Sequence, residues 1–516
     1  MPELEQVDVL ILGCGAAGVA AALAARRAGA EVAMIEHQAE DRHTPNTRMS
    51  GGWLMTLTDE VAGRGYLTEC AQGLVEDDLI AGWARGAVSL PTELKALGVD
   101  LELADTATWG LSRLDVEKDS WAEHAEIPGA DSVRVWRTVT DLPSTCPAAG
   151  GLATATGTVL GGEALYRGLM HAVRAAGVEV RWGIEPISLI LRQTADGTTV
   201  AGIRWLEGGT VRELRARGGV ILATGGFGAG RDLIREFLSV PNTRFYGNPG
   251  NDGSGLKLAM SAGAALARMN RMVGRGVMSF PLADGVELGF MVIMKGGGYV
   301  ICDDQGARYA DEYDQAMQQH SFFHHMQHVD PHTHRYSRSP SFYVFDERRR
   351  QSGPLTYQDR GACGVGLYDW SSDNQREIDA GWISVGPTPA AAAAAAGAGS
   401  PEAFEAAIAE YNRGCQAGSD SFGRPADTLI ALDQPPYYCV PLYIGGPYVT
   451  GGPQRNAEGQ VLGVRGGPVP GLFSGGELGQ AIGLLYPAQG ASISEAWCSG
   501  AIAGASAARA AGDSRR

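Results

Sequence analysis

Three glycines near the start of the chain have the spacing of a turn that binds the pyrophosphate of a dinucleotide. They are Gly13, Gly15 and Gly18, and a short apolar run comes directly before them. In such a turn the first glycine permits the sharp change of direction, the second lets backbone approach the phosphates, and the third lets helix and strand pack closely. The N–H groups at the start of the next helix, from Ala16 and Ala17 to Gly18, are expected to face the phosphates.

An acidic residue completes this pattern. Glu36 stands at the end of a second apolar run, where its carboxylate can accept hydrogen bonds from ribose hydroxyls. We include the next residue, His37, in the same site. Strand, turn, helix, second strand and acid all fall within one βαβ length, which favours a dinucleotide site over an ordinary glycine-rich turn. These residues alone do not distinguish FAD from NAD.

Two later segments are expected to lie beside this turn. An apolar run ends in Thr224, Gly225 and Gly226, and a parallel sheet would place this second glycine turn next to the first at its carboxyl edge. A tight turn near Ala491 and Ser492 begins a C-terminal helix, and the N-terminus of a helix suits a partial negative charge. The alternation of strands and helices predicts an α/β fold with a parallel sheet.

The composition of the chain and its pattern of strands and helices change at about Arg275. Residues 276–427 hold most of the histidines, a region rich in Tyr and Phe and an alanine tract, and they lack the βαβ rhythm. A chain of 516 residues is expected to form two or three domains, because a single core stops growing at about 250–300 residues. We expect an inserted domain at 276–427, between residues 1–275 and 428–516 of the first domain.

Composition excludes several classes of protein. The net charge of −16 argues against a nucleic-acid or anionic-membrane partner. The eight cysteines contain no C-x-x-C pair, which suits a reducing compartment better than a disulfide frame or a zinc site. The βαβ unit begins within a few residues of the N-terminus, leaving no room for a signal peptide, and no apolar run has the length of a membrane span. We therefore expect a cytoplasmic protein.

A set of short motifs occurs in the order and spacing of one known superfamily. They are Gly13-x-Gly15-x-x-Gly18 with Glu36, Ser50-Gly51-Gly52, Gly161-Gly162-Glu163, Ala223-Thr224-Gly225-Gly226-Phe227, Asn251-Asp252-Gly253-Ser254-Gly255, Gly306-Ala307-Arg308-Tyr309-Ala310-Asp311-Glu312, Tyr411-Asn412, Phe422-Gly423-Arg424 and Gly471-Leu472-Phe473-Ser474-Gly475-Gly476-Glu477. With them the chain resembles the fumarate reductase/succinate dehydrogenase flavoproteins and, among these, the 3-ketosteroid Δ1-dehydrogenase branch. The resemblance covers nearly the whole chain, apart from 105–150 and 313–340.

This resemblance implies a Rossmann-like FAD-binding domain with a parallel sheet and an inserted α+β substrate (cap) domain. It implies that Glu36 holds the adenosine ribose and that Glu477 holds the ribityl or pyrophosphate region. The turn at 491–493 would place N–H groups at the O2 edge of the flavin, where reduced flavin carries negative charge. Beyond the first turn, Glu36 and His37, the residues expected to hold FAD are Thr47, Ser50, Gly51, Gly52, Thr224, Gly225, Asp252, Glu477, Ala491, Ser492 and Ile493.

Enzymes of this branch move a hydride between flavin N5 and the carbon β to a carbonyl, while a protein group handles the α proton. The segment 435–442 resembles one whose tyrosine hydrogen-bonds the substrate carbonyl, and Tyr438 aligns with it. The segment 486–491 also resembles this branch. We expect Tyr438 to polarise the ketone and Tyr313 to take the α proton. Because a tyrosine with a pKa near 10 is a poor base at pH 7, Tyr313 would need a positive field or a proton relay.

Two departures weigh against succinate or fumarate as the substrate. The stretch 312–316 lacks the arginine proton donor of fumarate reductases, and Tyr448 stands in place of their dicarboxylate-binding histidine. Two alternatives stay open. One is a tricarballylate-type carboxylate dehydrogenase or enoate reductase, with Arg308, Arg424 and Arg455 as candidate basic groups. The other is a non-catalytic FAD-binding electron-transfer subunit. The physiological direction, the electron donor or acceptor and the oligomeric state also stay open.

The histidines raise the questions of metal binding and covalent flavin. His320, His324 and His328 have the i, i+4, i+8 spacing of one helical face, which can bind zinc or copper. We expect no metal, because no acid or cysteine stands at ligand spacing. His43 lies near the Ser-Gly-Gly loop, but its offset from Gly51 and Gly52 differs from that of the attachment histidine of succinate dehydrogenase. We therefore expect non-covalent FAD.

Overall fold

The computed structural model describes residues 5–104, 122–142, 159–194, 197–282, 285–293, 297–313, 320, 322–356 and 367–515. The chain divides into two compact units. Unit 1 comprises Met1–Leu233, Gly250–Arg271 and Val449–Arg516. Unit 2 comprises Ile234–Pro249 and Met272–Tyr448. Unit 2 thus extends beyond residue 427, where the sequence placed its end, because strand β18 (Tyr437–Val449) belongs to the unit 2 sheet.

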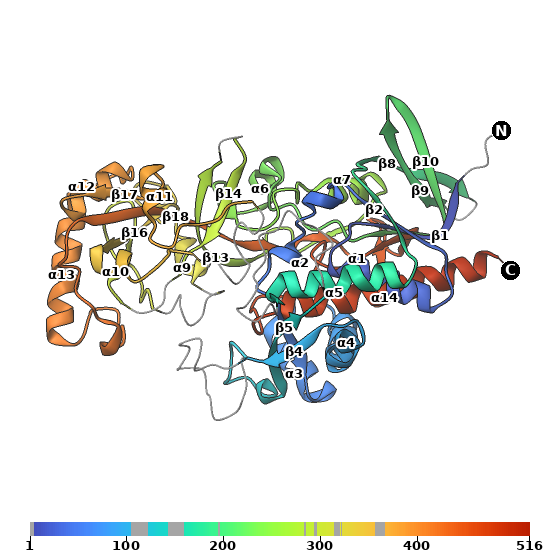
Figure 1. Cartoon of the computed structure of the whole chain (residues 1–516), viewed down its shortest axis with the longest axis horizontal. Helices are drawn as coiled ribbons and strands as arrows, with labels where there is room; N and C mark the ends of the chain where they lie inside the picture. Colours follow the sequence, from blue (N-terminus) through green and yellow to red (C-terminus); the bar gives the residue numbers. More distant parts are fainter. Residues whose placement is uncertain are drawn as a thin grey trace. The chain divides into compact units, whose positions relative to one another are not determined.

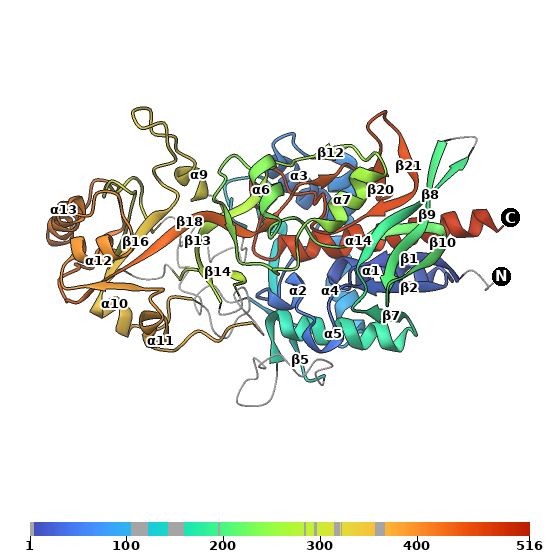
Figure 2. The same cartoon turned by 90° about the horizontal axis from the view of Figure 1, so that it is seen from above.

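A mostly parallel sheet forms the centre of unit 1 (Figures 1 and 2), as the sequence predicts. Its strand order is β20-β21-β10-β1-β2-β7, and only β20 in this row is antiparallel to its neighbour. The bounds are β1 Gln6–Leu12, β2 Val32–Glu36, β7 Glu179–Trp182, β10 Thr210–Leu222, β20 Gln460–Leu462 and β21 Pro468–Ser474. Leu12 pairs with Leu222, which pairs with Ser474, so three glycine turns begin at the same edge of the sheet.

Two helices pack together beside this sheet through small residues. Figures 1 and 2 show α14 (Ala491–Ser514) beside α1 (Ala16–Arg27). A Cβ at Gly500 would lie 2.1 Å from the Ala17 carbonyl oxygen, and one at Gly504 would lie 2.1 Å from that of Ala21. The two backbones therefore approach each other more closely than any larger residue would allow.

The other strands of unit 1 extend the main sheet, form a second sheet or, in the case of β12 and β19, pair as a two-stranded sheet. Strands β8 and β9 continue β10 as an antiparallel extension, and β3, β5, β4 and β6 form a separate sheet. The bounds are β3 Trp53–Leu57, β4 Asp100–Leu103, β5 Val133–Thr140, β6 Val159–Leu160, β8 Pro186–Thr194, β9 Gly197–Glu207, β12 Leu266–Ala267, β19 Gly452–Pro453, α2 Asn46–Met49, α3 Glu60–Ala71, α4 Asp77–Ala96, α5 Gly161–Ala175 and α7 Ser254–Ser261. Helix α6 (Arg231–Phe237) crosses the boundary between the two units.

Unit 2 is built on a sheet of order β14-β13-β18-β16-β15, with β11 and β17 also paired to β18. Its bounds are β11 Arg244–Phe245, β13 Met272–Pro281, β14 Glu287–Met291, β15 Tyr299–Cys302, β16 Ser341–Asp346, β17 Ser384–Gly386, α9 Phe323–Met326, α10 Glu347–Gln351, α11 Gln375–Asp379, α12 Pro389–Ala395 and α13 Ala403–Ala417. Aromatic residues fill much of its core, as in the stacked rings of Phe280 and Trp382. Helix α12 begins at Pro389 and contains the alanine tract except for its last residue, Ala396.

The predicted fold class is confirmed. Unit 1 has the parallel sheet and unit 2 mixes strands and helices, as expected of an α/β domain with an α+β insertion. Of the segment 105–150, residues 105–121 and 143–150 lie outside the described part, and the rest includes β5. Within the described ranges, no helix has the length and apolar character needed to cross a bilayer.

Candidate FAD site

In the first glycine turn, each of the three glycines is explained by a different feature of the structure. Gly13 has φ of +100°, and a Cβ there would lie 2.3 Å from the Ala223 carbonyl oxygen. A Cβ at Gly18 would lie 2.0 Å from the Gly13 oxygen. At Gly15 the nearest protein atom to an added Cβ is Thr47 Oγ1, at an ordinary 3.5 Å. The fold therefore requires Gly13 and Gly18, whereas Gly15 leaves its neighbourhood open for a ligand.

Glu36 is tied to this turn. It ends β2, is buried, and its Oε2 accepts a hydrogen bond of 2.9 Å from the Cys14 N–H. His37 Nδ1 lies 3.0 Å from Oε1. Burial raises the pKa of Glu36, but the contacts with His37 and His43 outweigh it and hold that pKa below its usual range. The buried carboxylate of Glu36 is thus held beside the glycine turn.

The polar loop after Glu36 folds back onto the helix start. Thr47 Oγ1 accepts a 2.9 Å hydrogen bond from the N–H of Ala16, the first residue of α1. Ser50 donates to the Thr47 carbonyl oxygen and accepts from the Gly52 N–H. A Cβ at Gly52 would clash with the Gly161 backbone. The structure therefore brings Thr47 to Ala16 and Gly15, and Ser50, Gly51 and Gly52 follow three to five residues after Thr47.

Glu477 is the centre of a second cluster in unit 1. Asn46 Nδ2 donates to its Oε2 at 2.7 Å, Asn251 Nδ2 donates to the same oxygen at 3.2 Å, and the Gly226 N–H also contributes. Burial raises the pKa of Glu477 to about 7, although these three donors oppose the shift. Val449 closes the cluster, because a Cβ at Gly226 would lie 2.6 Å from its Cγ2.

The remaining predicted residues around Glu477 have separate roles. Thr224 packs against Gly255, where a Cβ would lie 1.8 Å from Thr224 Oγ1. Gly225 has φ of +72°. Asp252 is exposed and accepts the Ser254 N–H at the start of α7, so its neighbour Asn251 is the residue that reaches Glu477. Asn46 is one of the polar donors in the loop after Glu36 and Asn251 lies in a quoted motif, but neither is among the predicted site residues.

The first turn of α14 is held by a tyrosine. The hydroxyl of Tyr486 lies 2.8 Å from Ser492 Oγ and accepts the Ser492 N–H at 3.4 Å. Ala491 is fully buried, whereas Ser492 and Ile493 are partly exposed. Gly490 has φ of +81°, and a Cβ there would lie 2.4 Å from the Trp53 backbone. Tyr486 was noted in the sequence only as part of a motif, and its contact with Ser492 required the folded turn.

Two of the three predicted catalytic tyrosines are far apart. Tyr438 and Tyr448 lie on the same strand, β18, ten residues from each other. At about 3.3 Å per residue they are separated by roughly 33 Å, so one small substrate does not reach both. Tyr438 donates a 2.6 Å hydrogen bond to Glu347 and stacks on Phe345. Burial and this contact raise the pKa of Tyr438 to about 12.

Tyr448 and Tyr313 have other surroundings. Tyr448 is buried and directly precedes Val449 of the Glu477 cluster. Tyr313 is nine-tenths buried in the apolar core of unit 2, and its N–H donates to Asp311. Residues 314–319, which follow it, lie outside the described part.

Each arginine proposed for a carboxylate substrate is already paired within the protein. Arg308 contacts Glu312 at 2.6 Å and Asp420 at 2.7 Å. Arg424 contacts the other oxygen of Glu312 at 3.2 Å. These guanidinium groups are almost completely buried, and their charges are balanced by protein carboxylates. Neither is available as an open receptor for a substrate carboxylate.

Arg455 shows the same arrangement in unit 1, where it forms a buried ion pair with Glu495. Both side chains are only 1% exposed.

The predicted histidine face is wrong. Helix α9 covers only Phe323–Met326, so His320 and His328 lie outside it and the i, i+4, i+8 spacing does not form one face. His320 is buried, whereas His324 is exposed. Among the described residues there is no group of three or more His, Cys, Asp or Glu side chains placed to hold a metal ion.

Comparison with known proteins identifies the family. A family model described as "FAD binding domain" matches residues 8–493. The chain belongs to this family. It is 23% identical over 523 residues to a fumarate reductase (cytochrome) of Shewanella frigidimarina, a match that covers 98% of this chain and 77% of the relative. It is 26% identical over 553 residues to 4-oxocyclohexanecarboxylate 2-dehydrogenase of Sinomonas cyclohexanicum, covering 96% and 92%.

A solved structure agrees in fold. The 3-ketosteroid Δ1-dehydrogenase of Sterolibacterium denitrificans, in complex with 1,4-androstadiene-3,17-dione, matches with a TM-score of 0.79 and 19% identity. The match covers 98% of this chain and 100% of the other. Family membership and these relatives confirm that the chain is an FAD-dependent oxidoreductase acting on C–C bonds. The prediction of an enzyme is confirmed, and the alternative of a non-catalytic subunit is set aside.

The residues of unit 1 fit FAD. The open side of Gly15 leaves room for a pyrophosphate next to the start of α1, and Glu36 lies at the strand end where the motif needs a ribose acceptor. Glu477 presents a carboxyl with little neighbouring charge, held by two side-chain amides. These features come from segments 13–52, 224–251 and 477–493, which are far apart in the sequence.

Proposed function

We propose that this enzyme introduces or reduces a C–C double bond next to the carbonyl of an apolar ketone, such as a 3-ketosteroid. Bound FAD supplies an acceptor or donor of hydride at its N5 atom. One observation carries the choice of a ketone over a carboxylate. The three arginines that are the candidate groups for binding a polycarboxylate are each paired with protein carboxylates.

The proposed FAD site lies in unit 1. The adenosine ribose contacts Glu36 and His37, and the pyrophosphate lies at the turn of Gly13 to Gly18 with Thr47. Glu477 holds the ribityl or pyrophosphate region. The other predicted residues line the rest of the cofactor towards the flavin, and they are Ser50, Gly51, Gly52, Thr224, Gly225, Asp252, Ala491, Ser492 and Ile493. His43 supports non-covalent binding, because its ring contacts Tyr166 and Glu36 at the ribose end of this site.

Tyr486 replaces Tyr438 as the proposed group that polarises the ketone. Its hydroxyl lies on the first turn of α14, against Ser492, which is predicted to contact the flavin edge. Tyr438 is withdrawn because its hydroxyl is bound to Glu347 and lies a strand's length from Tyr448. Tyr313 stays the proposed group for proton transfer, and Tyr448 stays a candidate catalytic residue. A hydroxyl aimed at the carbonyl oxygen stabilises the charge that develops when the α proton leaves.

Anaerobic substrate trials test the proposal. The FAD-loaded enzyme is mixed separately with a 4-ene-3-ketosteroid, 4-oxocyclohexanecarboxylate, succinate and tricarballylate, and the visible absorbance of the flavin is followed. The proposal predicts bleaching by at least one ketone and none by succinate or tricarballylate. If only the acids without a ketone bleach the flavin, the enzyme belongs to the carboxylate class. Reoxidation of dithionite-reduced enzyme by the matching enones tests the reverse direction.

A further inference from the structure

A buried ion pair in unit 1 supports the turn that carries Glu477. From the contacts of this pair we infer that Arg455, Glu495 and Ser499 are positioning residues for Glu477 in FAD binding. This inference rests on the proposed FAD site and adds to it three residues that are themselves outside that site.

The first step is the backbone contact at Gly476. Its N–H donates a 2.9 Å hydrogen bond to Ser499 Oγ, and Glu477 is the next residue. Gly476 has φ of +75°, and a Cβ there would lie 2.7 Å from Ala17 Cβ, so the turn is pressed against α1. On its other side, the Gly475 N–H is bound by the Leu222 carbonyl oxygen. The Ser499 side chain therefore holds the backbone of Gly476, the residue immediately before Glu477.

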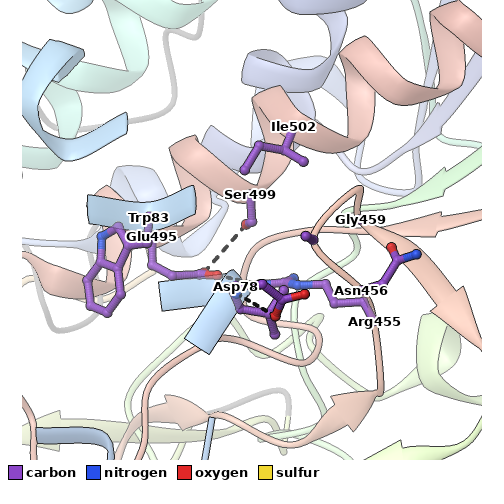
Figure 3. A pocket seen from close by; sticks show the side chains of 10 residues that line it. Asp78, Trp83, Arg455, Asn456, Gly459, Glu495, Ser499 and Ile502 are labelled. Carbon is purple, nitrogen blue, oxygen red and sulfur yellow. Dashed lines mark hydrogen bonds and ion pairs between the residues drawn. The ribbon is translucent and has the colours of Figure 1, made fainter. Parts of the chain in front are cut away.

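The second step connects Ser499 to the ion pair. Ser499 and Glu495 are four residues apart on α14, and their Oγ and Oε2 atoms lie 3.5 Å apart. The other oxygen of Glu495 binds Arg455. Figure 3 shows Arg455 and Glu495 pointing toward each other beside one small cavity, with Ser499 on the same wall. The guanidinium thus fixes the carboxylate, and the carboxylate faces the hydroxyl that holds Gly476.

The third step is the anchoring of Arg455 itself. It forms an isolated bridge with Val461, and the neighbouring Gln454 N–H donates to the Ala265 carbonyl oxygen. The segment that carries Arg455 is therefore fixed to two other parts of unit 1. A buried ion pair adds little net stability compared with well-packed apolar residues, so a positioning role gives a physical reason for its presence.

The decisive experiment measures the dissociation constant for FAD by flavin fluorescence, with the visible band shape of bound FAD as a second readout. Ser499→Ala removes the acceptor of the Gly476 N–H, and we expect about a five- to tenfold weaker affinity. Ser506→Ala is the matched control on the same helix, where the hydroxyl contacts Arg509 and is remote from Gly476. It should bind FAD as the unmodified enzyme does.

The ion pair is tested by the double variant Arg455→Met with Glu495→Met, because removing one partner alone would leave a buried unpaired charge. We expect weakened FAD binding and an altered band shape in this variant. If neither it nor Ser499→Ala changes FAD affinity while Glu477→Ala weakens it, the inference is overturned and the proposed site stands. If Glu477→Ala also binds FAD normally, the proposed site itself is wrong. Should the double variant fail to fold, Ser499→Ala decides.

Discussion

Single residues in this molecule are tuned by a few close neighbours, and Glu477 is the clearest case. Two asparagine amides and one backbone N–H face it, and its pKa is raised to about 7 because burial outweighs these donors. Its carboxyl therefore changes charge near neutral pH, where an ordinary glutamate is fully ionised. Tyr486, by contrast, is proposed for its position, because its hydroxyl contacts Ser492 on the first turn of α14.

The raised pKa of Glu477 predicts a pH dependence of stability. A carboxyl whose folded pKa lies above its unfolded value stabilises the fold fully below the unfolded value, near 4.5, and loses that contribution as pH rises through about 7. The FAD-free protein should therefore lose thermal stability between about pH 5 and pH 8 relative to Glu477→Gln, which lacks this titration. If the melting temperatures of the two proteins changed with pH in the same way, the raised pKa assigned to Glu477 would be contradicted.

Two tyrosine variants test whether Tyr486 or Tyr438 polarises the ketone. Tyr486→Phe should lower kcat with the best ketone substrate by about 10²–10³-fold, the usual effect of removing one donor to a developing oxyanion, while FAD content stays unchanged. Tyr438→Phe removes only the contact with Glu347 and should leave kcat within about twofold. Steady-state kinetics with both variants checks this. If Tyr438→Phe lowered kcat strongly and Tyr486→Phe did not, Tyr438 would be the group that polarises the ketone and Tyr486 would not.

At the scale of elements, the packing of α14 on α1 is the contact on which the site depends most. It brings the first turn of α14 and the glycine turn of α1 into one unit, and it tolerates no side chain at Gly500 or Gly504. The sequence predicted both helices, because capping, glycine turns and apolar runs are local signals. Their mutual packing is a long-range property that spacing within either segment does not reveal.

Two glycines of α14 test this packing. Gly504→Ala places a Cβ about 2.1 Å from the Ala21 carbonyl oxygen, and we expect a loss of about 2–3 kcal/mol in the free energy of unfolding. Gly512→Ala lies on the same helix with no atom within 4 Å of the added Cβ, and should be neutral or more stable by up to about 1 kcal/mol. Denaturant unfolding measures both. Equal stabilities would show that the helices separate at little cost.

At the scale of the whole molecule, the sequence predicted the fold class, FAD and the adjacency of two glycine turns, but not the contacts between distant side chains. The glycine turn could be predicted because all of its glycines lie within one short segment of the sequence. Tyr438 resembled a catalytic tyrosine in its local segment, yet strand β18 is long enough to separate it from Tyr448. The histidine spacing suggested one face, but α9 is only four residues long. Asn251 reaches Glu477 only because the fold brings together two loops that are 226 residues apart in the chain.

FAD loading should stabilise the molecule as a whole, because the proposed site exists only in the folded state. At a free FAD concentration of about 100 times the dissociation constant, linkage predicts about 2.7 kcal/mol of added stability. Thermal unfolding across a series of FAD concentrations should show a steadily rising midpoint. In Glu477→Ala the same concentrations should give a smaller rise, and an identical rise would argue against a contact between Glu477 and FAD.

The packing of α14 on α1 also sets an order of events during synthesis. The glycine turn of α1 is made before its partner helix α14, which follows about 470 residues later. At about 5–20 residues per second, the growing chain spends roughly half a minute to a minute and a half with the alanine-rich face of α1 uncovered. We therefore expect stable binding of FAD only after α14 has been made and has packed against α1.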